Sequence, residues 1–137
     1  MTIKVGINGL GRIGRMIIRT IFENNFNDIQ IKHINNRSNT QVSSNLLKYD
    51  SVHGKFNQNI QFSEKFIKLG QQKISFSQET NIEDINWSKN DVDYVLECTG
   101  KFNSKDKLSA HLKNGAKKVI VSAPCKNADK TIVFGVN

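Results

Sequence analysis

Apolar and polar positions along the chain change their spacing several times, and each spacing predicts a different element. Residues 3–7 (IKVGI) and 29–35 (IQIKHIN) are rich in β-branched residues and predict two strands. Between them, over residues 15–25, apolar side chains recur at the spacing of one helical face, which predicts a helix. Residues 3–35 are therefore expected to form a strand–helix–strand unit of about the length that a parallel crossover requires.

The next segment combines a helix with antiparallel strands. Residues 40–49 predict a short helix whose N-cap is Thr40 or Asn39. Residues 56–76 alternate between apolar and polar side chains around a turn at Gly70, a pattern typical of an antiparallel hairpin. This segment is expected to be a small insertion in the main fold.

The last third of the chain returns to alternating strands and helices. It predicts a buried strand, a helix capped by Ser104 and ended by Gly115, and two further strands, over residues 93–97, 104–114, 117–123 and 131–136. Strands that alternate with helices favour an α/β fold with a Rossmann-type, doubly wound, mostly parallel sheet. At this length, residues 1–137 are expected to be one domain.

Composition places the chain among soluble proteins. No apolar run approaches the roughly 20 residues that a membrane-spanning helix needs. The first residues (MTIKVGING) lack the basic and apolar regions of a secretory signal. The two cysteines, Cys98 and Cys125, are then expected to be reduced thiols of a cytoplasmic protein without a membrane partner.

The formal net charge of +8 raises the question of an anionic partner. The basic residues are scattered, with no block of five and no alternation with aromatic residues. This favours a general compositional bias, or a small anionic ligand such as a dinucleotide, over nucleic acid. Nucleic-acid binding stays as a weaker hypothesis, and its signature would be an affinity that falls steeply with salt.

A glycine-rich turn joins the first strand to the first helix. Gly9, Gly11 and Gly14 form the pattern G-x-G-x-x-G, and Arg12 adds a positive charge. In such a turn the glycines permit the sharp bend, the approach of a pyrophosphate and the close packing of helix on strand, while the helix N-terminus attracts the anion. Because the motif follows a strand and opens a helix, it predicts dinucleotide binding. The structural alternative is a tight turn without a ligand.

The choice between NAD and NADP stays open. The pattern asks for an acidic residue about 20 positions further on, to bind the adenine ribose. Asn36 stands there instead, and it would not repel a phosphate. Arg37 follows, and arginine is the residue type that accommodates a 2′-phosphate, although it can equally be a solvated loop charge.

Five ordered segments give the chain a specific resemblance over essentially its whole length. They resemble the nucleotide-binding half of the phosphorylating glyceraldehyde-3-phosphate dehydrogenases, and they read INGLGRIGR (7–15), KYDSVHGKF (48–56), ECTGKF (97–102), AHLKNGAKKVIVSAP (110–124) and FGVN (134–137). The resemblance implies an oxidoreductase of glycolysis that converts an aldehyde, NAD(P)⁺ and phosphate into an acyl phosphate.

The resemblance also implies which residues contact the cofactor. On the pyrophosphate and adenosine side these are Asn8, Gly9, Gly11, Arg12 and Ile13, with Asn35 and Asn36 at the adenine ribose. Beneath the cofactor and toward the nicotinamide they are Cys98, Thr99, Gly100, Phe102, Ser122 and Ala123. The second group also follows predicted strands, where ligands of open α/β sheets bind.

Two departures from the family pattern concern the adenosine end of the cofactor. Asn36 replaces the family's aspartate, and Thr80 replaces a residue that is usually arginine or lysine. We therefore include Arg37 and Thr80 among the cofactor-binding candidates and keep both NAD and NADP. The related erythrose-4-phosphate dehydrogenases also vary after the second strand, so a fragment of that type is an alternative.

We expect no catalytic residue in this chain. Family members use a cysteine thiolate and a histidine base that lie beyond the FGVN segment, so the chain alone is predicted to bind cofactor and to be inactive. Cys98 is expected to be a small packed residue, and no base is expected beside Cys125. The three histidines show no metal-binding spacing, so no metal is predicted.

An alternative to the enzyme hypothesis is that the chain is a non-catalytic NAD(P)-binding or interaction module.

The isolated chain is also expected to expose apolar surface. In the full-length family, which is tetrameric, the nucleotide-binding domain packs on the rest of the protein. We therefore expect exposed apolar surface here, and with it self-association or modest stability.

Overall fold

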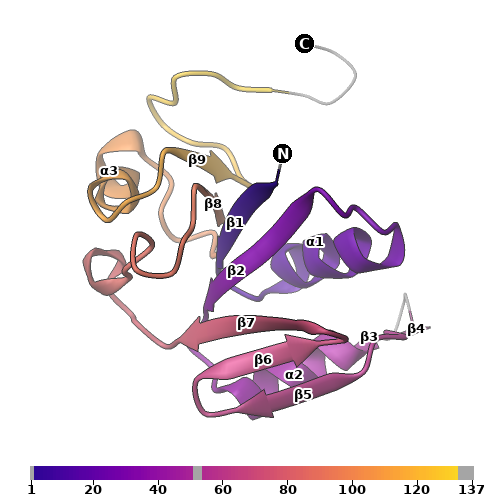
Figure 1. Cartoon of the computed structure of the whole chain (residues 1–137). Helices are drawn as coiled ribbons and strands as arrows, with labels where there is room; N and C mark the ends of the chain where they lie inside the picture. The colour runs from indigo at the N-terminus through magenta and orange to yellow at the C-terminus, as the bar shows by residue number, and fades with distance from the viewer. Residues whose placement is uncertain (1, 51–53, 133–137) are drawn as a thin grey trace.

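The computed structural model describes residues 2–50 and 54–132, and a seven-stranded sheet forms the centre of this part (Figure 1). Its strand order is β5-β6-β7-β2-β1-β8-β9. The bounds of the strands are β1 Ile3–Asn8, β2 Ile29–Asn35, β5 Ile60–Ser63, β6 Phe66–Leu69, β7 Gln72–Ser77, β8 Tyr94–Glu97 and β9 Lys118–Val121. A separate pair consists of β3 Tyr49–Asp50 and β4 Gly54–Lys55.

The helices are α1 Arg12–Glu23, α2 Thr40–Lys48 and α3 Lys105–Lys113, with a short 3₁₀ helix, η1, at Ile82–Asp84. In Figure 1, α1 and α3 lie on opposite sides of the sheet, and α2 lies behind β5 and β6. The pairs β2–β1, β1–β8, β8–β9 and β2–β7 are parallel. The predicted mostly parallel α/β fold of the Rossmann type is therefore confirmed.

The helix boundaries follow from local capping. Helix α1 begins at Arg12, three residues before the predicted start, because Gly11 at the N-cap has an extended backbone with φ −72° and ψ −165°. Of the two caps predicted for α2, the structure uses Asn39, whose side chain accepts a hydrogen bond from the Val42 N–H at 2.9 Å. Ser104 caps α3 as predicted.

The antiparallel insertion contains two turns where one was predicted. Strands β6 and β7 pair around Gly70, as expected. Strand β5 adds a second antiparallel pair with β6, so the segment is a three-stranded meander. Since β7 also pairs in parallel with β2, the insertion extends the main sheet. The strand expected over residues 131–136 falls mainly outside the described residues, and Thr131 and Ile132 have no regular structure.

Apolar side chains form two clusters, one on each face of the sheet. The first contains Ile7 and Ile34 of the sheet packed against Ile18 of α1, and the second gathers around Trp87. Trp87 lies directly over β1, since a Cβ atom on Gly6 would come within 2.5 Å of its ring. In the described part of the chain, no helix is long and apolar enough to cross a membrane.

Candidate functional site

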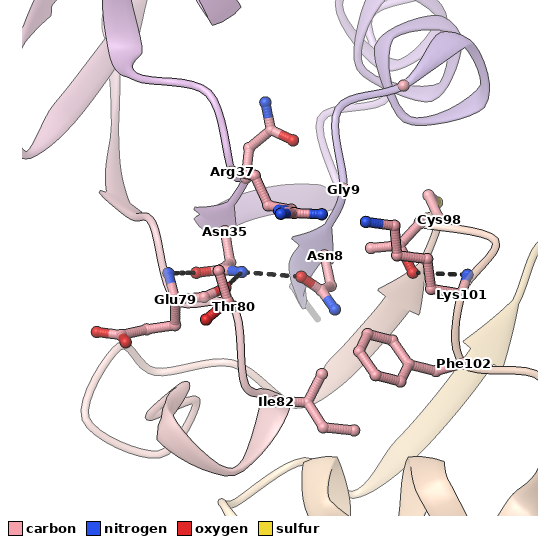
Figure 2. Close-up of a pocket in the computed structure, with 13 residues that line it drawn as sticks. Asn8, Gly9, Asn35, Arg37, Glu79, Thr80, Ile82, Cys98, Lys101 and Phe102 are labelled. Atoms are coloured by element: carbon pink, nitrogen blue, oxygen red, sulfur yellow. Dashed lines mark hydrogen bonds between the residues drawn. The ribbon is translucent and has the colours of Figure 1, made fainter.

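A cavity of about 330 Å³ opens beyond the carboxyl ends of β1, β2 and β8 (Figure 2). The chain moves from β1 to β2 on one side and later to β8 on the other, so the cavity lies where the strand order reverses. This is the place where open α/β sheets bind ligands. Its lining consists of Asn8, Gly9, Gly11, Asn35, Asn36, Arg37, Glu79, Thr80, Ile82, Cys98, Thr99, Lys101 and Phe102.

The glycine turn forms one wall of this cavity. Gly9 has φ +99°, a conformation that side chains disfavour, and its N–H donates to the Asn35 carbonyl at 2.8 Å. Gly11 caps α1 without a side-chain hydrogen bond, and the first turn of α1 carries no acidic residue. Among the residues that the structure describes, none apart from its chain neighbours has an atom within 4 Å of a Cβ atom built on Gly11. The N-terminus of α1 therefore presents backbone donors and free space to an anion.

Asn36 ties this turn to the following helix. Its Oδ1 accepts from the Leu10 N–H at 3.1 Å, and its Nδ2 donates to the Ser43 hydroxyl at 3.0 Å. The orientation of the amide is therefore fixed by two partners of the chain itself. The neighbouring Arg37 extends its guanidinium into the cavity (Figure 2). The adenosine-side candidates thus combine a neutral amide, Asn36, with a positively charged guanidinium, Arg37.

Asn35 is fully engaged in the floor of the cavity. Its Nδ2 donates to Asn8 Oδ1 and to the Glu79 carbonyl, both at 2.9 Å. Its Oδ1 accepts from the Glu79 N–H at 2.9 Å and from the Ser77 hydroxyl at 2.6 Å. All four hydrogen-bonding positions of the amide are used, so Asn35 shapes the cavity and has no position left for a ribose hydroxyl.

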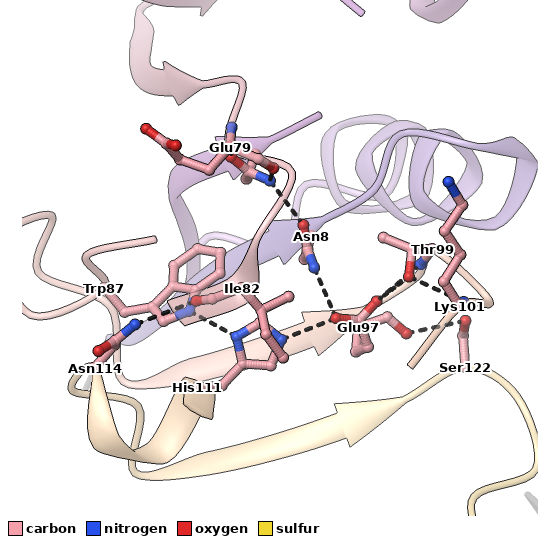
Figure 3. Close-up of polar contacts among 11 residues, drawn as sticks. Asn8, Glu79, Ile82, Trp87, Glu97, Thr99, Lys101, His111, Asn114 and Ser122 are labelled. Carbon is pink, nitrogen blue, oxygen red and sulfur yellow. Dashed lines mark hydrogen bonds and ion pairs between the residues drawn. The ribbon is translucent and has the colours of Figure 1, made fainter. Parts of the chain in front are cut away.

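Glu97 closes the floor from β8 and is 1% exposed. Burial alone would raise the pKa of this carboxyl, but hydrogen bonds from His111, Thr99 and Asn8 lower it below its ordinary value. Glu97 is therefore a buried carboxylate beneath the cavity (Figure 3).

Cys98 lies beside this carboxylate and is also buried. Burial raises the pKa of its thiol to about 11, and the negative charge of Glu97 acts in the same direction. The thiol is therefore protonated at neutral pH and is a poor nucleophile. Cys98 fits a packed position in the cavity wall.

The family described as glyceraldehyde 3-phosphate dehydrogenase, NAD binding domain, matches residues 3–105. The chain belongs to this family. Because this domain binds NAD in the family, the cofactor of the chain is a dinucleotide, NAD or NADP.

Relatives in the family match the full length of the chain. It is 45% identical over 137 residues to glyceraldehyde-3-phosphate dehydrogenase of Cereibacter sphaeroides. The identity is 45% over 140 residues with the enzyme of Lactobacillus delbrueckii subsp. bulgaricus, and 41% over 134 residues with that of Thermotoga maritima. The alignments cover 98–100% of this chain and 40–41% of those three relatives. The chain thus spans about two fifths of the length of the family members it matches.

The structure brings most of the sequence-predicted site residues of this NAD-binding domain together. The cavity lining contains Asn8, Gly9, Gly11, Asn35, Asn36, Arg37, Thr80, Cys98, Thr99 and Phe102. Five candidates lie outside that lining, namely Arg12, Ile13, Gly100, Ser122 and Ala123. Ile13 lies instead in an apolar groove on the α1 side of the sheet. The Ser122 hydroxyl donates to the Glu97 carbonyl at 3.2 Å, so it lies at the edge of the floor.

Three lining residues were not among the candidates: Glu79, Ile82 and Lys101. Lys101 stands inside the ECTGKF segment, and its charge beside two candidates was a usable signal. Glu79 and Ile82 reach the cavity because the loop after β7 folds back over the ends of β1 and β2. The one-dimensional pattern contains no signal for that path.

Proposed function

We propose that this chain binds NAD or NADP at the cavity beyond β1, β2 and β8 and is the nucleotide-binding part of a phosphorylating glyceraldehyde-3-phosphate dehydrogenase-type oxidoreductase. The observation that carries the proposal is the N-terminus of α1, where Gly11 provides no side-chain cap and lines the cavity. The diphosphate would lie against the backbone donors of this turn. When bound, the nicotinamide supplies the hydride acceptor for an aldehyde.

The proposed residue roles follow the geometry. Gly9, Gly11 and Thr99 would form the walls along the diphosphate, while Arg37 and Thr80 would face the adenosine end. Asn8, Asn35 and Asn36 would hold the walls in place, since their amides bond within the chain. Arg12, Gly100, Ser122 and Ala123 would contact only those parts of a dinucleotide that extend past the cavity.

We assign residues 1–137 to one nucleotide-binding domain that does not perform the chemical step by itself. A covalent step on an aldehyde needs a thiolate next to a base. The Cys98 thiol stays protonated. His33 and His111 are buried, and both form hydrogen bonds to other side chains. The catalytic half would come from sequence outside these residues. Since both cysteines are free thiols, we place the protein in the cytoplasm.

Binding is tested by titrating the wild-type chain with NAD and with NADP. A ligand that binds only the folded state raises the melting temperature with its concentration. We expect such a rise with at least one of the two nucleotides, and saturable heat in calorimetry. Nucleotide at about millimolar concentration reveals binding as weak as about −4 kcal/mol. If neither measurement changes at that concentration, the proposal is contradicted.

Cofactor choice is tested with Asn36→Asp. A carboxylate can still accept hydrogen bonds from the Leu10 N–H and the Ser43 hydroxyl, so the fold tolerates the change. Its charge would repel a 2′-phosphate, and we expect NADP to weaken by roughly tenfold relative to NAD. Asn39→Asp is the matched control, because it adds the same charge at a helix cap outside the cavity lining. An unchanged ratio of NADP to NAD affinity in Asn36→Asp would refute the idea that the charge at position 36 influences cofactor choice.

We further propose that the chain self-associates through the α1 side of the sheet. A groove of about 550 Å³ lies there between α1 and the strands β1, β2, β8 and β9. Its lining is apolar except for a threonine and a tyrosine, and Ile13, Phe26 and Ile120 are 45–57% exposed. A continuous apolar groove of this kind favours association with a second copy.

A further inference from the structure

The carboxylate of Glu97 receives two chains of hydrogen bonds beneath the cofactor cavity (Figure 3). The first comes from Trp87, whose Nε1–H donates to His111 Nδ1 at 2.9 Å. An indole can only donate, so His111 Nδ1 carries the lone pair and Nε2 carries the proton. Nε2 then donates to Glu97 Oε1 at 2.8 Å. His111 is therefore neutral, and the pair is a hydrogen bond to a carboxylate.

The second chain has its direction set by the backbone. Asn35 contacts both the N–H and the carbonyl of Glu79, and only one orientation of its amide satisfies both. Its Nδ2 therefore donates to Asn8 Oδ1, and Asn8 must turn its own Nδ2 toward Glu97 Oε1, at 2.7 Å. Position 97 must consequently offer an acceptor to both Asn8 and His111.

The second carboxylate oxygen holds the adjoining wall. Glu97 Oε2 accepts from the Thr99 N–H at 3.0 Å and from the Thr99 hydroxyl at 2.6 Å. The Thr99 hydroxyl in turn accepts from the Lys101 N–H at 3.1 Å. Within residues 2–50 and 54–132, no lysine or arginine pairs with Glu97. Four donors alone therefore hold the negative charge.

We propose that Glu97 is a positioning residue of the cofactor site, which sets dinucleotide affinity by fixing Asn8 and Thr99. This inference rests on the proposed function. Asn8 and Thr99 line the cavity, whereas Glu97 is outside the lining and acts through them. An amide at position 97 has the same shape but carries one NH₂ group. In either orientation of the glutamine side chain, the NH₂ group faces a hydrogen-bond donor, either Asn8 and His111 or the Thr99 N–H, and one hydrogen bond at least is lost.

The test compares NAD and NADP affinities by calorimetry in the wild-type chain, Glu97→Gln and Glu83→Gln. Glu83 is the control, since its exposed carboxylate lies outside the cavity lining and its loss changes the net charge equally. We expect Glu97→Gln to bind at least tenfold more weakly and Glu83→Gln to bind as the wild type does. In ¹⁵N NMR spectra, the side-chain amides of Asn8 and Asn35 should shift in Glu97→Gln and stay in place in the control.

A second pair of variants decides the question if Glu97→Gln does not fold. His111 lies outside the cavity lining, and a glutamine there can accept from Trp87 and donate to Glu97, whereas a phenylalanine can do neither. We expect His111→Gln to retain more dinucleotide affinity and wild-type-like Asn8 amide signals, and His111→Phe to lose both. Equal affinities within each folded pair, with wild-type binding intact, would overturn the inference alone. Absence of binding in the wild-type chain would overturn the proposed function and the inference with it.

Discussion

At the scale of single residues, His33 shows how burial sets a protonation state. It is 4% exposed, and its ring contacts the hydroxyls of Ser75 and Ser77 at 2.6 and 2.8 Å. The Ser77 hydroxyl donates to Asn35, so it accepts from His33 Nε2–H. Burial lowers the pKa of His33 to about 4, which keeps the ring neutral at physiological pH.

This shift predicts a loss of stability in acid. The unfolded histidine binds a proton near its ordinary pKa, while the folded one does so only near pH 4, so protons favour the unfolded state between these values. We expect the free energy of unfolding to fall by about 2 kcal/mol from this residue between about pH 7.5 and about pH 5. Urea unfolding at both pH values, in the wild type and in His33→Gln, measures it. An equal pH-dependent loss in the two proteins would disagree with the neutral buried state.

The sequence predicted which residues line the cavity better than it predicted the hydrogen bonds between them. Asn36 and Thr80 were singled out from the sequence, and both line the cavity. The partners of Asn35 and Asn36 could not be predicted, because Glu79, Ser77 and Ser43 reach them only through the folding of distant loops and helices. Glu97 has no periodicity or spacing that marks it as a buried carboxylate.

At the scale of elements, the turn from β1 to α1 depends on close contact between helix and strand. A Cβ atom on Gly14 would lie 2.2 Å from the Gly9 carbonyl oxygen. The space between Gly14 and the Gly9 carbonyl is too small for any side chain, and this carbonyl cannot easily move because it belongs to the backbone of the turn. Gly14 therefore sets the depth at which α1 packs on β1.

We predict that Gly14→Ala destabilises the chain by about 2 kcal/mol or more, because α1 must move off the sheet. The intrinsic helix preference of alanine offsets only about 1 kcal/mol of this cost. Denaturant unfolding measures the change, with Gly11→Ala as the control in the same turn. A Gly14→Ala protein as stable as the wild type would contradict the packing described for α1.

Elements with a strong local pattern were predicted almost to the residue. Strand β2 has the predicted bounds Ile29–Asn35, and α3 begins after the predicted cap at Ser104. The meander was harder, because alternation over residues 56–76 gives the faces of the strands but leaves the number of turns open. The 3₁₀ helix η1 has three residues, too few for a periodic pattern.

At the scale of the whole molecule, the two faces of the sheet differ in how well they are covered. One face buries Trp87 and its neighbours beneath α3 and η1. The α1 face leaves the groove along β8 and β9 open, and Ile120 on β9 is 57% exposed. The family resemblance predicted exposed apolar surface, but the place of the groove follows only from the sheet order.

The groove predicts association that depends on concentration. Sedimentation velocity over a roughly hundredfold concentration range should show the wild-type chain moving from monomer toward dimer. Ile120→Lys should shift this transition to higher concentration by placing a charge in the groove. Leu112→Lys is the control, since Leu112 on α3 is 46% exposed and outside the groove. Identical behaviour of the two variants would assign the contact to another surface.

The most direct test of the account is the affinity of Gly11→Ala for dinucleotide. The new methyl group meets no atom of residues 2–50 and 54–132 within 4 Å and lies beside the N-terminus of α1, where the diphosphate is proposed to lie. Calorimetry with NAD and NADP, paired with melting temperatures in the absence of ligand, separates binding from folding. The account predicts a folded protein with a slightly lower melting temperature, because alanine is a poorer N-cap than glycine, and an affinity at least tenfold lower than that of the wild type. Wild-type affinity in a folded Gly11→Ala protein would contradict it.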